Sequence, residues 1–262
     1  YKLLGQAGIP VPPHGVARGP DEAARIAEDI GFPVVMKIVS PGIVHKSDAG
    51  GVVRGIHDSG EVRSAFQEIL SRVKEKAPGA SIQGIIVEKE LSPGLEVLIG
   101  GKTDATFGKV LTFGLGGTLV EVLRDVAIRL LPLGREEARA MVREIRGYRL
   151  IAGYRGEPPR DEEALVSLLT AAAEMFSRED VPEFDLNPVI LHEKGACAVD
   201  ARIYRGGEAP VPSRKIHCAL APEILSPASI AVVGASGDPS KVGYAVFRNL
   251  LPFPGRPYAV NP

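Results

Sequence analysis

The sequence is poor in cysteine and in long apolar runs, and its charges almost cancel. It has two cysteines in 262 residues, Cys197 and Cys218, which fit neither a disulfide framework nor a zinc-binding pattern. Its longest apolar stretch, residues 110–123, is broken by glycines, contains Glu121 and is too short to span a bilayer. A net charge of −1 gives no general attraction to nucleic acid or to an acidic membrane surface. We therefore expect a cytoplasmic protein with no nucleic-acid partner and no membrane partner.

Several common catalytic motifs are missing as well. The chain has no Gly-x-Ser-x-Gly elbow and no His-Glu-x-x-His zinc motif. Gly100-Gly101-Lys102-Thr103 ends like a phosphate loop, but Glu96 stands where the first glycine is required. Gly114-Leu115-Gly116-Gly117 begins like a dinucleotide fingerprint, but Leu119 stands in place of its last glycine. These patterns argue against a Walker-type loop and give only weak support to a dinucleotide site.

The residues that are abundant indicate a folded chain with many turns. Hydrophobic residues make up 45% and charged residues 24%, and there are 30 glycines and 22 prolines. Helical and strand periodicities interleave without a strict strand–helix–strand repeat, which favours α+β subdomains over one doubly wound sheet. We expect helices at 21–28 (with Asp21 as N-cap), 60–76, 135–146 and 161–177, and strands at 33–39, 52–57, 83–88, 95–100, 109–113, 183–191 and 195–203.

The character of the chain changes after residue 205. Residues 206–212 have no periodicity and are typical of a linker. Residues 229–260 then predict a strand, a helix and a second strand. One such unit cannot cover both faces of a parallel sheet, so we expect the chain to be a piece of a longer protein. The expected organisation is a first domain at 1–205, a linker at 206–222 and the start of a Rossmann-like domain at 223–262.

Lys37 lies inside the otherwise apolar strand at 33–39. A buried lysine is costly unless an anion meets it, so its position suggests phosphate binding. The alternative is a lysine whose aliphatic stem packs in the strand while its ammonium group reaches water.

The loop that follows this strand combines a histidine, a lysine, a carboxylate and two glycines. Glycine amides approach phosphate oxygens closely, and a lysine neutralises their charge. A histidine in this setting suits a proton carrier, a ligand or a phosphoryl acceptor, and a nearby carboxylate can orient its ring. The alternative is an ordinary polar surface turn. The residues concerned are His45, Lys46, Asp48, Gly50 and Gly51.

Asn187 and Asp200 are predicted to be neighbours across a hairpin. The alternation at 183–188 places Glu183, Asp185 and Asn187 on one face of a strand, and Asp200 lies on the next strand. An amide oxygen and a carboxylate are hard ligands suited to a magnesium ion that binds nucleotide phosphates. A solvent-facing acidic strand is the alternative.

Taken in order, these segments resemble the ATP-grasp domain of ADP-forming acyl-CoA synthetases. Those enzymes make acetate and ATP from acetyl-CoA, ADP and phosphate, and they are relatives of succinyl-CoA synthetase. The resemblance covers residues 1–204, and residues 227–236 resemble the start of the CoA-binding domain of the same enzymes. The segments that carry it are Lys37, 45–52, 87–90, 94–97, 114–125 and 185–188.

The resemblance implies a nucleotide site between two subdomains, with the break near residues 88–95. His45 would be a second phosphoryl carrier, which receives the group from a phosphohistidine on the CoA-binding part and delivers it to ADP. The phosphates would be bound by Lys37, Lys46, Gly50 and Gly51. The rest of the nucleotide would contact Glu88, Leu91 and Glu96. The magnesium ion would be held by Asn187 and Asp200.

The resemblance also implies an ADP-forming acid–CoA ligase of the acetate–CoA ligase type. The expected cofactors are Mg²⁺, ATP or ADP, and CoA. The expected partners are acyl-CoA or carboxylic acid substrates and an alpha-type CoA-binding domain or subunit, in an oligomer. Two alternatives stay open: a non-catalytic regulatory module of a protein acetyltransferase-type protein, and an ATP-grasp carboxylate–amine ligase. The complete set Lys37, His45, Glu88, Asn187 and Asp200 argues against the first. The His45 loop and the CoA-binding start argue against the second.

Overall fold

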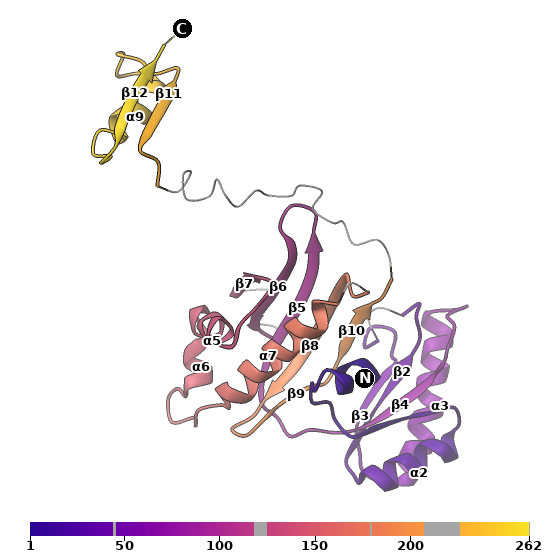
Figure 1. Ribbon diagram of the computed structural model, residues 1–262. Helices are drawn as coiled ribbons and strands as arrows, with labels where there is room; N and C mark the ends of the chain where they lie inside the picture. Colours follow the sequence, from indigo (N-terminus) through magenta and orange to yellow (C-terminus); the bar gives the residue numbers. More distant parts are fainter. Residues whose placement is uncertain (44–45, 118–124, 179, 207–225, 262) are drawn as a thin grey trace. The chain divides into compact units, whose positions relative to one another are not determined.

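The computed structural model describes residues 1–43, 46–117, 125–178, 180–206 and 226–261. The chain divides into two compact units, Tyr1–Val211 and Pro212–Pro262. The first unit contains two antiparallel sheets, and the second contains one short parallel sheet (Figure 1). This mixed architecture confirms the predicted α+β subdomains followed by a partial parallel unit. No helix among the described residues is long and apolar enough to cross a membrane.

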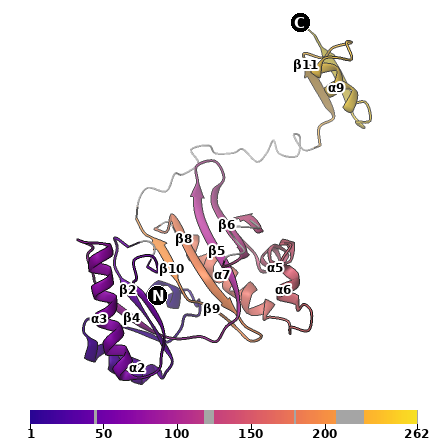
Figure 2. The ribbon, with the colours of Figure 1, turned by 180° about the vertical axis from the view of Figure 1, so that it is seen from behind.

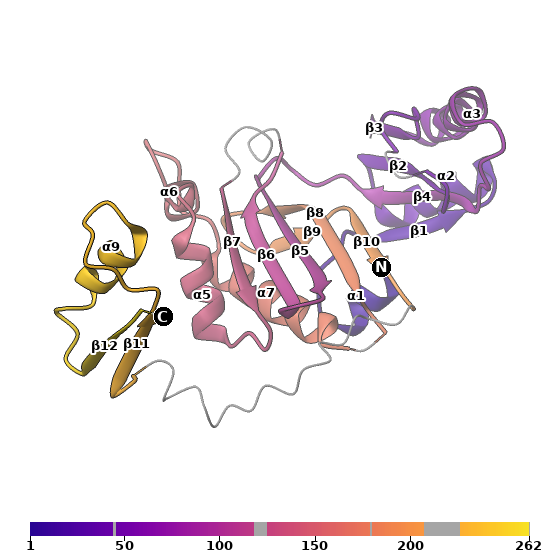
Figure 3. The ribbon, with the colours of Figure 1, turned by 90° about the horizontal axis from the view of Figure 1, so that it is seen from above.

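The smaller sheet of the first unit has the strand order β1-β4-β2-β3. Two helices, α2 and α3, contact each other and pack on one face of this sheet, which leaves the other face for the site (Figure 3). The elements are β1 (His14–Ala17), α2 (Pro20–Ile30), β2 (Val34–Val39), β3 (Val52–Ile56), α3 (Ser59–Lys76) and β4 (Gly84–Lys89).

Helix α2 starts earlier than the sequence predicted. Its N-cap is Gly19 and Pro20 occupies the first helical turn, so the prediction of Asp21 as N-cap was wrong. Proline suits this position because its fixed φ matches the helix and its missing N–H group would be unpaired there anyway. Asp21 lies in the first turn instead, where its charge interacts favourably with the helix dipole.

The larger sheet has the order β10-β8-β5-β6-β7, and β9 also pairs with β8. Its core is built on one face around Phe113, Phe176 and Phe184. The single strand predicted at 195–203 is two strands, which are interrupted at Val199 and Asp200. The elements are β5 (Leu95–Asp104), β6 (Gly108–Leu115), β7 (Val126–Leu130), α5 (Arg135–Glu144), α6 (Tyr148–Ala152), α7 (Glu162–Phe176), β8 (Glu183–Leu191), β9 (Ala196–Ala198) and β10 (Ala201–Tyr204).

The first helix, α1 (Lys2–Gln6), belongs to the larger sheet although the next strand belongs to the smaller one. Leu4 and Ile9 are buried in the core of the larger sheet, and the Ala198 amide donates to the Pro10 carbonyl at 2.9 Å. Figures 1 and 2 both show this indigo segment beside the orange strands β8 to β10. The chain therefore starts on the larger sheet, crosses to the smaller sheet, and returns between β4 and β5.

The second unit is a strand–helix–strand unit, as predicted. Strands β11 (Ser229–Val233) and β12 (Arg256–Val260) pair in parallel, and α9 (Val242–Asn249) connects them. Gly243 is required at the contact between helix and strand, because a Cβ atom there would lie 2.0 Å from the Gly234 carbonyl oxygen. Among the described residues of this unit, Ala235 alone is buried. The unit thus has strand pairing but almost no core of its own.

Candidate functional site

A cavity of about 820 Å³ lies between the two sheets of the first unit. The smaller sheet contributes side chains from β2, β3 and the loop between them, and the larger sheet contributes β8 and the segment between β9 and β10. The connection from β4 to β5 closes one end. Seven of the residues predicted to form a site line this cavity: Lys37, Lys46, Asp48, Glu88, Leu91, Glu96 and Asp200.

Lys37 is a buried charge with two partners. Its Nζ lies 2.6 Å from Glu88 Oε2 on the neighbouring strand β4 and donates to the Val199 carbonyl, at 2.7 Å, in the larger sheet. Its side chain is 10% exposed and that of Glu88 is 1% exposed. An ion pair this deeply buried is kept in place by the cost of leaving either charge unpaired. An ammonium group has three donors, so one remains for a ligand in the cavity.

Tyr1 reaches the same pair from the N-terminal helix. Its hydroxyl lies 2.7 Å from Glu88 Oε1 and 2.7 Å from the Val199 carbonyl oxygen. Burial, and then the negative charge of Glu88, raise the pKa of the Tyr1 phenol, so the group stays protonated at neutral pH. The same two causes raise the pKa of the nearby Cys197 thiol to about 11. Burial and the charge of Glu88 therefore keep the nearby phenol and thiol protonated.

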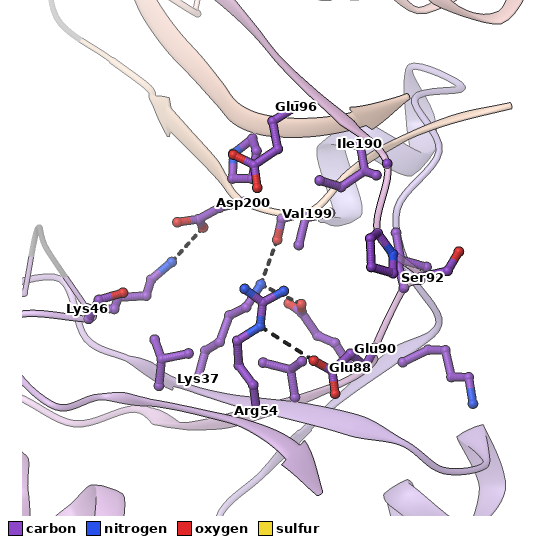
Figure 4. Close-up of a pocket in the computed structure, with 18 of the residues that line it drawn as sticks. Lys37, Lys46, Arg54, Glu88, Glu90, Ser92, Glu96, Ile190, Val199 and Asp200 are labelled. Atoms are coloured by element: carbon purple, nitrogen blue, oxygen red, sulfur yellow. Dashed lines mark hydrogen bonds and ion pairs between the residues drawn. The ribbon is translucent and has the colours of Figure 1, made fainter. Parts of the chain in front are cut away.

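Lys46 and Asp200 form a second, more open pair across the cavity. Lys46 Nζ lies 2.7 Å from Asp200 Oδ1, and the two side chains are 24% and 29% exposed. Figure 4 shows Lys37, Lys46 and Arg54 entering from the smaller sheet, with Asp200 and Glu96 opposite them on the larger sheet. Because solvent reaches the Lys46–Asp200 pair, either partner can exchange for a ligand at modest cost.

The predicted proximity of Asn187 and Asp200 is present in the backbone. The Asn187 amide donates to the Asp200 carbonyl at 3.1 Å, and Leu186 pairs with Ala201 in adjacent strands. Asn187 is exposed and is not among the described residues that line the cavity. An amide oxygen and a partly exposed carboxylate are ligands that suit a divalent cation. Among the described residues, no group of three or more His, Cys, Asp or Glu side chains gathers at one point. A metal held here would therefore need oxygens from a ligand.

The connection between the sheets carries a second set of charges. The Gly55 amide donates to Glu90 Oε2 at 2.8 Å, and Arg54 Nε lies 3.5 Å from Glu90 Oε1. Lys89 Nζ donates to the Phe32 and Gly31 carbonyls at 2.6 and 3.0 Å. These bonds attach residues 89 and 90 to the smaller sheet and fix the backbone at this end of the cavity.

The glycines predicted to bind phosphate have different surroundings. Gly50 forms a turn with φ +68°, and Gly51 is buried where an added Cβ would lie 2.4 Å from Ile38 Cγ2. Neither is among the described residues lining the cavity, whereas Lys46, Ser47 and Asp48 of the same loop are. His45 lies outside the described residues.

Glu96 meets the glycine-rich segment that follows β6. The Gly116 amide donates to the Glu96 carbonyl at 2.7 Å, and a Cβ on Gly117 would lie 2.8 Å from Glu96 Oε2. The segment that resembled a dinucleotide fingerprint thus contacts the cavity wall. Residues 118–124, which continue it, lie outside the described residues.

Three groups that line the cavity or contact its lining differ in how far the sequence could identify them. Val199 acts through its carbonyl, and a backbone oxygen leaves no mark in a sequence. Tyr1 is distant in the chain from Glu88 and belongs to a helix that the sequence did not predict. Arg54 could have been predicted to line the cavity. Val52 pairs with Lys37, and Arg54 lies two residues later on the same face of β3.

Comparison with known proteins agrees with this geometry. Residues 1–204 match the ATP-grasp domain family. The chain is 44% identical over 203 residues to the beta subunit of acetate–CoA ligase (ADP-forming) I of Pyrococcus furiosus, covering 77% of this chain and 88% of that subunit. It is 42% identical over 247 residues to acetate–CoA ligase (ADP-forming) II of Archaeoglobus fulgidus, covering 92% of this chain and 35% of that protein. The chain spans about a third of the length of such single-chain relatives.

Solved structures give the same result. A complex of acetyl-coenzyme A synthetase 1 from Ca. Korarchaeum cryptofilum with coenzyme A and Ca-AMPCP superposes with a TM-score of 0.75 at 44% identity, over 78% of this chain and 90% of that one. Another structure of that protein, with coenzyme A and Mg-AMPPCP, has a phosphohistidine segment pointing towards the nucleotide-binding site. It superposes with a TM-score of 0.67 at 40% identity, over 78% and 88% of the two chains.

Proposed function

We propose that this chain is the nucleotide-binding part of an ADP-forming acid–CoA ligase. The chain belongs to the ATP-grasp domain family, and it is similar to the beta subunits of ADP-forming acetate–CoA ligases. Such an enzyme interconverts acyl-CoA, ADP and phosphate with carboxylic acid, CoA and ATP. The observation that carries the proposal is the cavity in which Lys37 and Lys46 extend from the smaller sheet and its loop toward Val199 and Asp200 on the other side. Phosphoryl transfer depends on positioning and charge neutralisation, which two lysines on the same side of the cavity can supply.

The two ends of the cavity suit the two ends of a nucleotide. Residues 90–94 provide fixed backbone at one end, where Leu91 gives an apolar surface and Glu90 a carboxylate. Lys37 and Lys46 provide positive charge at the other end. We assign the base and ribose to the first end and the phosphates to the second.

Asp200, with Asn187 beside it, is our candidate for holding magnesium. The ion would neutralise phosphate charge, and its remaining ligands would come from the nucleotide and water. Lys46 now contacts the Asp200 oxygen that such an ion would need. This lysine would then be free to bond a phosphate oxygen.

The remaining assignments rest on the resemblance and on the relatives. We assign residues 1–205 to the ATP-grasp domain, 206–222 to a linker and 223–262 to the start of a CoA-binding domain. Support comes from the relative that aligns over 92% of this chain. We also propose that an alpha-type partner supplies CoA binding and a phosphohistidine, that the complete enzyme is oligomeric, and that it works in the cytoplasm. Acyl-CoA and carboxylic acid would be its other substrates.

Calorimetric titration of the 262-residue chain with ADP and magnesium tests the proposal. Wild-type protein should bind, and Lys37→Met should bind at least tenfold more weakly, because a phosphate loses its buried cation. Lys74→Met, on the exposed side of α3, is the matched control and should bind like wild type. No measurable binding by a folded wild-type sample would refute the proposal.

His45 is our candidate for a phosphoryl carrier, and the complete enzyme is needed to test it. His45→Ala should leave nucleotide affinity within about threefold, a change of roughly 0.65 kcal/mol. ATP synthesis from acyl-CoA should collapse, while phosphorylation of the CoA-binding part persists. An alanine variant that still made ATP at near wild-type rate would show that His45 is an ordinary loop residue.

A further inference from the structure

We infer that Tyr1 is a positioning residue for the phosphate-binding lysine. The inference rests on the proposed function and adds to it a residue outside the segments that carry the family resemblance. Tyr1 and Lys37 contact the same two acceptors, the Glu88 carboxylate and the Val199 carbonyl. The position of the Lys37 ammonium group therefore depends on what Tyr1 does to those acceptors.

The Glu88 carboxylate is held at both oxygens. Oε2 contacts Lys37, and Oε1 contacts the Tyr1 hydroxyl at 2.7 Å. No other donor among the described residues contacts Oε1. Removal of the hydroxyl would leave one oxygen of a 1% exposed carboxylate unpaired, which is costly enough to make the group rotate toward its remaining donor. That donor is Lys37, so Glu88 would draw the ammonium group away from the cavity.

Tyr1 is itself anchored on the larger sheet. It precedes α1, whose Leu4 is fully buried in the core of the larger sheet, and its ring also packs edge-on against His14 of β1 in the smaller sheet, with centroids 4.6 Å apart. Its hydroxyl then crosses to Glu88 in the smaller sheet. Tyr1 is thus a link between the two sheets at the point where Lys37 makes its own crossing to Val199.

The chemistry of the hydroxyl suits this role. Burial and the charge of Glu88 raise the phenol pKa, so the group stays a donor throughout the neutral range. It neutralises no charge itself. When a phosphate takes over part of the bonding of Lys37, Tyr1 still supplies Glu88 with a donor, which lowers the cost of sharing the lysine.

The test is a double-mutant cycle for ADP binding in the presence of magnesium. Tyr1→Phe should weaken binding by about tenfold relative to wild type. Lys37→Arg keeps a cation, so its binding stays measurable, but it changes the contacts with Glu88 and Val199. Because Tyr1 acts through Lys37, the Tyr1→Phe/Lys37→Arg variant should bind within about twofold of Lys37→Arg alone.

Tyr148→Phe is the matched control. Its hydroxyl donates to Glu162 Oε2 at 2.6 Å, between α6 and α7 and away from the cavity. Both phenylalanine variants should lose some thermal stability, but Tyr148→Phe should leave ADP affinity unchanged. Equal ADP affinity of Tyr1→Phe and wild type, or the same loss in both Lys37 backgrounds, would overturn the inference. Failure of wild type to bind ADP would instead refute the proposed function.

Discussion

Two lysine–carboxylate pairs border the same cavity, and they differ in how deeply they are buried. Lys37–Glu88 is almost closed to solvent and shares its acceptors with Tyr1, whereas about a quarter of each side chain in Lys46–Asp200 is exposed. The Lys37–Glu88 pair is locked, in the sense that separating the two charges would leave an unpaired ion in the protein interior. Charge in the second pair is exchangeable, because water can replace either partner. The difference shows that the Lys37–Glu88 pair defines the shape of the site, whereas the Lys46–Asp200 pair can exchange its contact for one with a ligand.

The comparison is tested most severely by breaking the buried pair. Lys37→Met should lower the free energy of unfolding by about 3 kcal/mol, because it leaves Glu88 buried without its cation. Lys37→Met/Glu88→Gln removes both charges and should recover to within about 1 kcal/mol of wild type. Urea unfolding measures both values. If the single variant were as stable as the double variant, the pair would not be locked.

The exchangeable pair should respond to magnesium. Asp200→Ala should weaken ADP binding by about thirtyfold with magnesium present but by less than threefold in EDTA, because its carboxylate would act through the ion. Asn187→Ala should show the same pattern with a smaller loss. Asp185→Ala, on the same strand but outside the lining of the cavity, is the control. An equal loss with and without magnesium would assign both residues a structural role.

Lys46→Ala separates stability from binding. The free energy of unfolding should change by less than about 1 kcal/mol, since the Lys46–Asp200 pair is partly exposed. Affinity for ADP with magnesium should nevertheless fall by about tenfold, because the phosphates lose a cation. Arg63→Ala, which removes an exposed pair with Asp21 on α2 and α3, should leave both quantities unchanged. A large loss of stability in Lys46→Ala would show that the Lys46–Asp200 pair is as important for stability as the Lys37–Glu88 pair.

The smallest expected effect uses Cys197 as a reporter of the buried pair. Its thiol pKa of about 11 arises first from burial and then from the charge of Glu88. Glu88→Gln removes the second cause and should lower this pKa, so alkylation at pH 9 should become about twofold faster. A Cys218→Ser background leaves Cys197 as the one reactive thiol. An unchanged rate in a variant that stays folded would mean that Glu88 carries little charge.

The sequence predicted local elements better than the contacts between them. The apolar run of β2 and the alternation of β8 are visible from periodicity alone, and the hairpin that places Asn187 beside Asp200 follows from one short turn. The break between β9 and β10 was not predictable from periodicity, and at this break the Val199 carbonyl accepts from Lys37. That contact spans 162 positions of the chain and uses a backbone atom, so no side-chain pattern encodes it.

The role of Tyr1 was hidden for a related reason. An isolated aromatic residue before a five-residue helix is a weak local signal, and the packing of Leu4 on a distant sheet decides where it lies. The positions of Lys37 and Lys46 could be suggested from residue type. Their unequal burial depends on how two sheets meet, which requires the folded chain.

The path of the chain through the first unit makes the smaller sheet an insertion. The segment leaves the larger core after Val11 and returns before Leu95, and its two ends are joined where the Lys89 amide donates to the Pro13 carbonyl at 2.9 Å. An insert whose own fold brings its ends together adds little loop-closure entropy to its host. The smaller sheet is also connected to the larger one by two neighbouring chain segments, one before β1 and one after β4, rather than by one. Two attachments oppose rotation of the smaller sheet about a single strand, so they help to keep Lys37 opposite Val199.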